Sequence, residues 1–421
     1  MLKINSYILG ISLTTLCLSP VSYAQSSVTP NVAASLQKVV DDYYNKYSKK
    51  EKFTAIQASV LIPKPQEANQ YEVKTAFKGT FGMPPISKTI NADSLFDIGS
   101  ITKSFTALML LQLQAEGKLS LEDHLGKWLP QYPNWREVTL RQLLNMTSGI
   151  PNYSEDDVFS KKMEANLSRI WTDEELLSYA HPEKPLPKHR KSLYEYCNSN
   201  YILAGMVIEK ATGDTFANQL KLRIVNAKNG LNHTYYPAGP DGESIQKAIS
   251  SQKVHGYYFD EKTQKLQGTF DNNLSWAGAA GAIVANTEDV VQWVQLLYHG
   301  KLIDAAHRER ALAELKSVVS MKTGLPIPTV TAEEPAGFGL GVGYYYDKEL
   351  QQKFWVYKGS TLGFRTMYFW QPCNNVTTVV ALNGKGGEGN PDSKLGDEIL
   401  SANLNLYKLI IKSHPELKCM S

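Results

Sequence analysis

The segments that favour β-strands lie at the two ends of the chain, and this arrangement restricts the fold more than any other feature. Near the start, residues 53–62 and 71–81 are rich in β-branched and aromatic residues and flank a polar loop, which predicts a hairpin. In the last quarter, four further strand-like runs follow one another: 337–346, 354–357, 366–370 and 376–382. Because parallel pairing needs a crossover of about a dozen residues, these short gaps predict antiparallel pairing.

Helical patterns fill the middle of the chain and close it at both ends. Residues 31–49 repeat apolar side chains at helical spacing, and a last helix is expected from about residue 392 to 411. The expected fold class is therefore α/β (α+β), with an antiparallel sheet flanked by N- and C-terminal helices and a mostly helical domain inserted. We expect residues 25–98 and 279–421 to form the sheet domain and residues 99–278 the helical domain, with the functional site between them.

Size and composition exclude several classes of protein. The chain has 421 residues, of which 43% are hydrophobic and 20% charged, so it is globular rather than disordered. Its formal net charge of +3 is spread evenly, which argues against a nucleic-acid partner because phosphates require a basic stripe. Its four cysteines form no CxxC pair, so a zinc ribbon or a dithiol redox centre is not expected.

The first 24 residues have the layout of a secretory signal peptide. Lys3 precedes an apolar run over residues 8–18, and Ser22 and Ala24 place small side chains before a cut at Gln25. The alternative, an N-terminal anchor helix, is disfavoured because this run is too short to span a bilayer. No other stretch is long enough, so we expect no membrane span after cleavage. The predicted localisation is exported, either periplasmic or secreted.

Three cysteines remain after that cleavage. Export implies an oxidising compartment, which makes Cys373 and Cys419 a candidate disulfide between a turn and the end of the chain. The alternative is two unpaired surface thiols. Cys197 has no obvious partner.

A serine and a lysine three residues apart begin one of the apolar helices. The chain contains four Ser-x-x-Lys tetrads, but only Ser100-Ile101-Thr102-Lys103 opens a buried helix directly after an apolar strand and a glycine. The helix N-terminus there can stabilise negative charge near Ser100. Lys103, in apolar surroundings beside the hydroxyl, loses its proton more readily and can act as a base. The alternative is a capping serine next to a lysine that reaches solvent.

Two further segments carry suitable chemistry. Tyr196 and Asn198 offer a phenol and an amide where a loop meets a helix. A tyrosine near an ammonium can pass its proton to a leaving group, and an amide can hold both the lysine and a substrate carbonyl. The strand that enters the turn at Gly359 can pair with an extended substrate, and the next residue, Ser360, can give a backbone N–H to an oxyanion.

In this order the three segments resemble the serine β-lactamase and penicillin-binding protein superfamily. The most similar branch comprises class C β-lactamases, D-alanyl-D-alanine carboxypeptidases of that type and related esterases. The resemblance extends over residues 94–382, and further blocks typical of the family lie at 96–106, 117–123, 139–151 and 277–289.

The resemblance implies a role for each candidate residue. Ser100 would be the nucleophile and Lys103 its base partner, while Tyr196 and Asn198 would form the second element of the site. The backbone N–H groups of Ser100 and Ser360 would form the oxyanion hole. Neither a metal nor an organic cofactor is expected.

The third element of the site departs from the family pattern. A basic residue, a small residue and a glycine are usual there, whereas this chain has Tyr357, Lys358 and Gly359. On a strand, the side chain of Lys358 should point to the face opposite that of Tyr357. The sequence leaves open which of the two fills the role. Since the basic residue commonly helps to hold a substrate carboxylate, the departure counts against β-lactamase or strict carboxypeptidase activity.

The predicted function is that of an exported serine hydrolase that works through an acyl-enzyme on Ser100. A D-alanyl-D-alanine carboxypeptidase-like activity is favoured because export places the protein beside peptidoglycan. Its partner would be a small molecule or a peptide, such as a peptidoglycan stem peptide or a β-lactam. The alternatives are a carboxylesterase or β-lactamase of the same fold, or a binding protein that has lost turnover.

Overall fold

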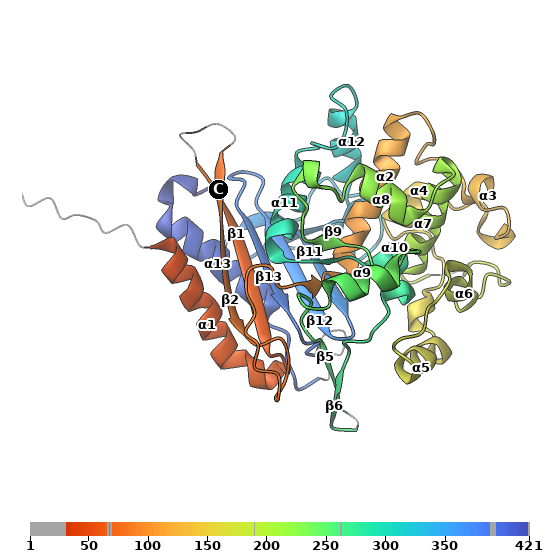
Figure 1. Cartoon of the computed structure of the whole chain (residues 1–421). Coiled ribbons are helices and arrows are strands. Elements are labelled where there is room, and N and C mark those ends of the chain that lie inside the picture. The colour runs from red at the N-terminus through yellow and green to blue at the C-terminus, as the bar shows by residue number, and fades with distance from the viewer. Residues whose placement is uncertain are drawn as a thin grey trace, which may run out of the picture. The chain divides into compact units, whose positions relative to one another are not determined.

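A computed structural model describes residues 31–64, 67, 70–188, 190–261, 263–387 and 393–419 (Figure 1). Residues Asn31–Ser421 form one compact unit. The expected signal peptide, residues 1–24, lies outside the described residues. The expected boundaries between a sheet domain and a helical domain, at residues 99 and 278, stay a prediction.

An eight-stranded antiparallel sheet forms the centre of the fold, with the strand order β2-β1-β13-β12-β11-β10-β9-β8. The N-terminal hairpin joins the sheet through β1 and β13, where Ile56 pairs with Leu382. The expected antiparallel sheet built from both chain ends is therefore confirmed. The strands are β1 (Ala55–Pro63), β2 (Tyr71–Gly79), β8 (Val319–Ser320), β9 (Ala336–Phe338), β10 (Gly343–Asp347), β11 (Gln352–Thr361), β12 (Phe364–Trp370) and β13 (Thr377–Leu382).

The single strand expected over residues 337–346 is wrong, because the chain forms two strands there, β9 and β10. Gly341 lies in the bend between them with a φ of +74°. A Cβ atom at Gly341 would lie 2.8 Å from the carbonyl oxygen of Lys103. The bend therefore needs a glycine both for its backbone conformation and for its close approach to the helix that carries Lys103.

One face of the sheet is covered by the two terminal helices, α1 (Val32–Glu51) and α13 (Ile399–Ser413), which lie side by side in Figure 1. The side chain of Asn31 caps α1 by accepting from the N–H groups of Ala33 and Ala34. Apolar side chains of both helices pack on this face in one buried cluster. The expected flanking helices are confirmed, although α13 begins at Ile399 rather than near residue 392.

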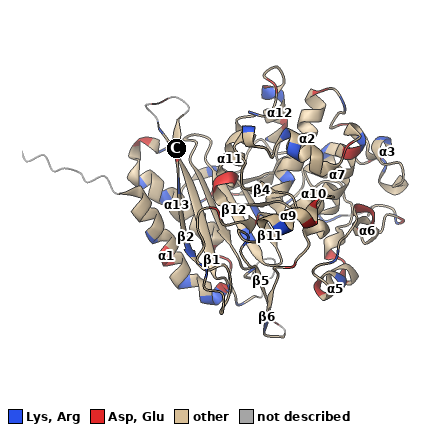
Figure 2. Ribbon diagram, in the orientation of Figure 1, with Lys and Arg blue, Asp and Glu red and all other residues tan. Residues whose placement is uncertain are grey.

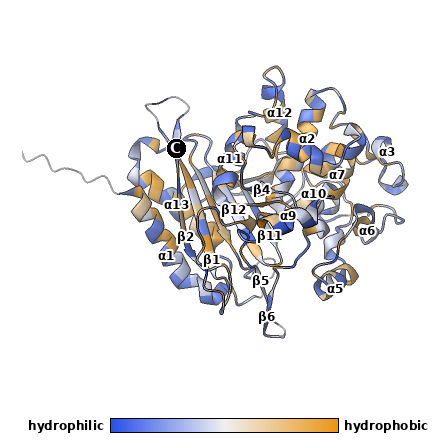
Figure 3. Cartoon of the chain, in the orientation of Figure 1, coloured by the Kyte–Doolittle hydropathy of each residue, from blue (hydrophilic) through white to orange (hydrophobic). Residues whose placement is uncertain are grey.

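The other face of the sheet packs against helices from the middle of the chain. The helices α10 (Gly278–Gly281) and α11 (Thr287–Tyr298) contact the sheet, and α2 (Thr102–Ala115) and α7 (Ser199–Thr212) pack in the same buried cluster. Twelve residues of α2 are buried, as its apolar sequence predicts. Phe105 of α2 stacks on Trp293 of α11 with 3.6 Å between ring centroids. Figure 3 shows hydrophobic residues along the central strands that both layers cover.

Shorter elements complete the described part of the chain. The helices are α3 (Leu125–Trp128), α4 (Leu140–Leu144), α5 (Asp157–Ala165), α6 (Asp173–Ser178), α8 (Phe216–Arg223), α9 (Gly242–Ile249) and α12 (Arg308–Leu315). Three strands, β3 (Phe96–Asp97), β4 (Thr234–Tyr235) and β7 (Val284–Ala285), form a small sheet in the order β3-β7-β4. Two more, β5 (Tyr257–Asp260) and β6 (Lys265–Gly268), form a hairpin.

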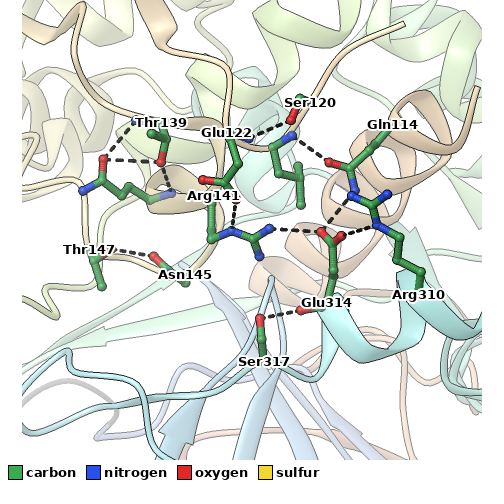
Figure 4. Close-up of polar contacts among 12 residues, drawn as sticks. Gln114, Ser120, Glu122, Thr139, Arg141, Asn145, Thr147, Arg310, Glu314 and Ser317 are labelled. Carbon is green, nitrogen blue, oxygen red and sulfur yellow. Dashed lines mark hydrogen bonds and ion pairs between the residues drawn. The ribbon is translucent and has the colours of Figure 1, made fainter. Parts of the chain in front are cut away.

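A polar network around Glu314 joins α12 to α2 and α4 (Figure 4). Its carboxylate accepts hydrogen bonds from Gln114, Arg141 and Arg310, each at 3.1 Å. Burial alone would raise the pKa of Glu314, but these three donors outweigh burial and lower it. The network therefore holds an ionised carboxylate between three helices.

Cys373 and Cys419 form a disulfide in the structure, with 6.1 Å between their Cα atoms. The bond ties the turn between β12 and β13 to the end of the chain.

Basic and acidic residues are interspersed over the described elements in Figure 2. None of the helices in the described ranges has both the length and the apolar character needed to cross a membrane.

Candidate active site

Ser100 lies in a short 3-10 turn, Gly99–Ile101, between β3 and α2. Two glycines bring this turn against β11. A Cβ atom at Gly99 would lie 2.4 Å from the backbone nitrogen of Ser360. A Cβ atom at Gly359 would lie 1.8 Å from the carbonyl oxygen of Ile98 and 2.8 Å from the backbone nitrogen of Ser100. The two backbone nitrogens predicted to form an oxyanion hole therefore belong to segments in direct contact.

Lys103 is fully buried one helical turn after Ser100. Its Nζ atom lies 3.0 Å from Ser100 Oγ and donates to the carbonyl oxygen of Ala280 at 2.7 Å. Burial lowers the pKa of Lys103 well below its ordinary value. Among the described residues, no carboxylate forms an ion pair with Lys103 that would restore its positive charge. A neutral amine beside Ser100 can accept the hydroxyl proton.

Tyr196 approaches Ser100 from the other side. Its hydroxyl lies 2.6 Å from Ser100 Oγ, and Lys103 Nζ lies 4.9 Å from the centre of its ring. Tyr196 is 36% exposed, so a substrate can reach this residue, whereas Lys103 is fully buried. Ser100 Oγ thus lies within hydrogen-bond reach of two groups, Lys103 Nζ and the Tyr196 hydroxyl, that can exchange a proton with it.

Asn198 lies close to this group but makes different contacts from those expected. Its side-chain nitrogen donates to Ser154 Oγ at 2.8 Å, and its backbone N–H donates to Asn152 Oδ1 at 3.0 Å. No hydrogen bond between Asn198 and Lys103 is found in the described part of the chain. The oxygen that holds Lys103 is instead the carbonyl of Ala280, which the sequence analysis did not identify.

The available signal for Ala280 was the small-residue block at 277–281. Small side chains let α10 pack closely, since a Cβ atom at Gly205 of α7 would lie only 2.7 Å from the Cβ of Ala279. Close packing of this kind brings a backbone carbonyl of α10 to Lys103. The sequence of the block does not indicate which of its backbone carbonyls faces the lysine.

Tyr357 and Lys358 lie on opposite faces of β11, as strand alternation requires. Tyr357 is buried on the face that carries the site, with its ring centroid 5.7 Å from that of Phe338. Burial is the main cause that raises the pKa of Tyr357, and the neighbouring Tyr196 is the second. Lys358 lies on the face covered by α1 and α13 and is paired with Asp397. The position that usually carries a cation in the site therefore carries an uncharged phenol.

A buried ion pair supports the turn that carries Ser100, and the sequence analysis did not identify it. Lys253 Nζ lies 2.7 Å from a carboxylate oxygen of Asp97, and both side chains are almost fully buried. The other carboxylate oxygen of Asp97 accepts from Thr361 Oγ1 at 3.0 Å. Asp97 thus links β3, which precedes Ser100, to the end of β11.

Cys197, between Tyr196 and Asn198, is buried and unpaired. Its thiol donates to the carbonyl oxygen of Ile150 at 3.2 Å. Burial raises the pKa of this thiol to about 11, so it stays protonated and is a poor nucleophile. No group of three or more His, Cys, Asp or Glu in the described ranges is placed to hold a metal ion.

Comparison with known proteins identifies similar sequences and structures. A sequence model of the β-lactamase family matches residues 74–401. Penicillin-binding protein 4* of Bacillus subtilis (strain 168) is 27% identical over 246 residues, which are 54% of this chain and 50% of that protein. The chain spans about half the length of the curated relatives it matches.

Two solved structures extend the comparison over most of the chain. A D-stereospecific amidohydrolase from Streptomyces sp. is 26% identical with a TM-score of 0.65, covering 84% of this chain and 94% of that chain. The D-amino acid amidase from Ochrobactrum anthropi SV3, complexed with D-phenylalanine, is 20% identical with a TM-score of 0.71, covering 91% and 99%. At that identity the second comparison supports the fold alone.

Proposed function

The chain belongs to the β-lactamase family, a family of serine hydrolases, and we propose that it cleaves amide bonds through an acyl-enzyme formed on Ser100. One observation carries the proposal. Ser100 Oγ lies within hydrogen-bond reach of both Lys103 Nζ and Tyr196 Oη, while burial lowers the pKa of Lys103. A hydroxyl placed between a neutral amine and a phenol can lose its proton to one and return it through the other.

The proposed acylation begins when Ser100 Oγ attacks the substrate carbonyl and its proton passes to Lys103 Nζ, 3.0 Å away. Negative charge develops on the carbonyl oxygen, and the backbone N–H groups of Ser100 and Ser360 would stabilise it. As the C–N bond breaks, Tyr196 donates its proton to the leaving amine and regains one from Lys103. Water then attacks the ester, the C–O bond to Ser100 breaks, and Ser100 recovers its proton as the acid product forms.

For the substrate, we favour an amide whose leaving side bears no carboxylate. Tyr357 occupies the position where the family commonly places a carboxylate-binding cation, and Lys358 is held by Asp397 on the opposite face of β11. A buried phenol can neither neutralise a carboxylate nor donate the charged hydrogen bond that a lysine would. The 26% identical amidohydrolase, which covers 84% of this chain, is consistent with an amide substrate.

A D-alanyl-D-alanine carboxypeptidase-like activity is the second candidate. Its support is the similarity to penicillin-binding protein 4*, which covers half of that relative. It requires recognition of a terminal carboxylate without a cation at residue 357. Export through a signal peptide at residues 1–24, to the periplasm or the medium, remains part of this proposal.

A matched pair of substrates tests the two candidates. We would measure kcat/KM for N-acetyl-D-alanyl-D-alanine and for the same dipeptide with a C-terminal carboxamide. We expect the carboxamide to be the better substrate. Tyr357→Lys should raise kcat/KM for the free acid about ten- to a hundredfold, because a charge-assisted hydrogen bond contributes about 1.5–3 kcal/mol. Tyr357→Phe, which adds no charge, is the matched control and should leave the ratio of the two substrates unchanged.

Other outcomes have definite meanings. Preference of the native protein for the free acid would establish the carboxypeptidase candidate and overturn the amide preference. Turnover of esters alone would indicate a carboxylesterase, and destruction of benzylpenicillin without a lasting adduct would indicate a β-lactamase. If Ser100→Ala retained turnover, the proposed mechanism would be wrong, because loss of a nucleophile should cost at least about 10³-fold. A folded protein without turnover of any of these would be a binding protein.

A further inference from the structure

A second cavity, of about 390 Å³, lies among α6, α7, α8 and α10. Its lining includes three aromatic side chains, Trp171, Phe216 and Tyr236, and two carboxylates, Asp173 and Glu209. Neither Ser100 nor Tyr196 lines it. The helix α10 lies between this cavity and Lys103, because Gly278 and Ala279 line the cavity while Ala280 holds the lysine.

The first of these two carboxylates is that of Asp173. Among the described residues it accepts no hydrogen bond and forms no ion pair. Burial raises the pKa of Asp173 to about 7, and the negative charge of Glu209 is the second largest cause of this rise. Asp173 is only partly exposed at the surface, and its carboxyl end keeps some contact with solvent. That end lies over α10, since a Cβ atom at Gly278 would lie 3.5 Å from Asp173 Oδ1. A largely desolvated carboxylate with no donor among the described residues can gain one from a bound cation, because desolvation is normally offset by hydrogen bonds.

The second carboxylate is only partly satisfied. Glu209 accepts one hydrogen bond, from the backbone N–H of Phe216 at 2.8 Å. No lysine, arginine or histidine lines the cavity. The nearby guanidinium of Arg169 lies on the ring of Trp171 and is already paired with Glu175. Two negative groups therefore face one cavity without a positive charge from the described protein.

The aromatic walls decide which kind of cation fits. No group of three or more His, Cys, Asp or Glu that could hold a metal ion is found among the described residues. Phe216 and Tyr236 instead pack together, with 5.1 Å between ring centroids, and the ring of Trp171 also lines the cavity. Aromatic faces attract organic cations and bury their apolar parts. The volume is within the range of small-ligand sites.

We propose that this cavity binds a small organic cation, an ammonium or amidinium group joined to an apolar body. The cationic group pairs with Asp173 and Glu209, and the apolar body lies against the three aromatic rings. The site is separate from the proposed acyl-enzyme chemistry and does not depend on it.

Calorimetric titration with benzamidine tests the proposal, with benzamide as the neutral molecule of nearly the same shape. We expect benzamidine to bind at one site, at least tenfold more tightly than benzamide. Asp173→Asn and Glu209→Gln should each weaken benzamidine binding at least tenfold. Glu174→Gln removes the same charge from an exposed neighbour that does not line the cavity, and should leave binding within about twofold.

Binding at Ser100 must be distinguished from binding in this cavity. The titration is therefore repeated on protein whose Ser100 has been blocked with a phosphonate, and benzamidine should bind unchanged. Loss of binding on blocking Ser100, equal binding of benzamide, or unchanged binding in folded Asp173→Asn protein would each overturn the proposal. Circular dichroism of each variant shows that it is folded.

Discussion

Lys103 and Asp173 are both buried ionisable side chains, and burial shifts their pKa values in opposite directions. It lowers the pKa of the lysine and raises that of the carboxyl, because both groups are disfavoured in the charged form. For Lys103 this shift produces the neutral base that the proposed acylation needs. Asp173 lines a cavity apart from Ser100, and desolvation of its charged carboxyl, which no described residue pairs with, costs stability.

The pH dependence of stability should reveal this cost. With a pKa of about 7 when folded and an ordinary value of 3.8, Asp173 favours the folded state fully below about pH 4, and this contribution is lost as pH rises to about 7. Three pKa units correspond to about 4 kcal/mol, and partial exposure of the residue reduces this. We therefore expect Asp173→Asn to be about 1–3 kcal/mol more stable than the native protein at pH 8.

Urea unfolding at pH 8 and at pH 4 would measure this difference, with Glu174→Gln as the matched control. At pH 4 the two proteins should differ little, because Asp173 is then protonated in the folded state. A native protein at least as stable as Asp173→Asn at pH 8 would show that Asp173 has a partner that the structure does not reveal.

At the scale of single residues, the sequence predicts contacts between residues that are close in the chain and misses contacts between residues that are far apart in it. Ser100 and Lys103 lie one helical turn apart, so their contact follows from helix geometry. Ala280 is 177 residues from Lys103 in the chain, and its carbonyl carries no side-chain signal. Asp173 has the sequence context of an ordinary helix start after the capping residue Thr172, and only the packing of several helices places it in one cavity with Glu209.

Among the elements, β11 carries two different environments on its two faces. Tyr357 faces the proposed site, while Lys358 joins a charged group with Asp397 and Arg365 on the other face. Arg365 is fully buried, pairs also with Glu51 at the end of α1, and lies opposite Ser360 in the strand register. We infer that Asp397 positions β11, and so the backbone N–H of Ser360, without touching the substrate.

Asp397→Asn should therefore lower kcat about three- to tenfold while changing KM less, because the oxyanion donor acts mainly in the transition state. It should also lower the free energy of unfolding by about 1–3 kcal/mol, because it removes the negative charge that pairs with both Lys358 and Arg365. Steady-state kinetics and urea unfolding measure the two effects. Glu349→Gln, which breaks the exposed pair with Lys408, is the control and should change neither.

If Asp397→Asn lost stability but kept kcat, Asp397 would be structural only and the positioning role would be wrong.

Strand alternation predicts the opposite faces of Tyr357 and Lys358 from the sequence alone. The division of residues 337–346 into β9 and β10 was not predicted, because the requirement for the bend at Gly341 comes from its contact with the distant Lys103 backbone.

Over the whole described chain, the sheet depends on contacts between the two ends of the sequence. β1 pairs with β2 on one side and with β13 on the other. The sequence predicts the antiparallel pairing and the flanking helices, because short gaps and apolar periodicity are local properties. It does not predict the cavity lined by Asp173 and Glu209, because segments from four separate helices and their connecting loops enclose it.

The central claim, that Ser100 is the nucleophile, is tested most directly by mapping the residue that reacts with a fluorophosphonate. The native protein is labelled, digested and analysed by peptide mass spectrometry, with Ser100→Ala treated in parallel. We predict a single adduct on Ser100, absent from Ser100→Ala and formed much more slowly in Lys103→Ala. An adduct on another residue, or a folded native protein that does not react, would contradict it.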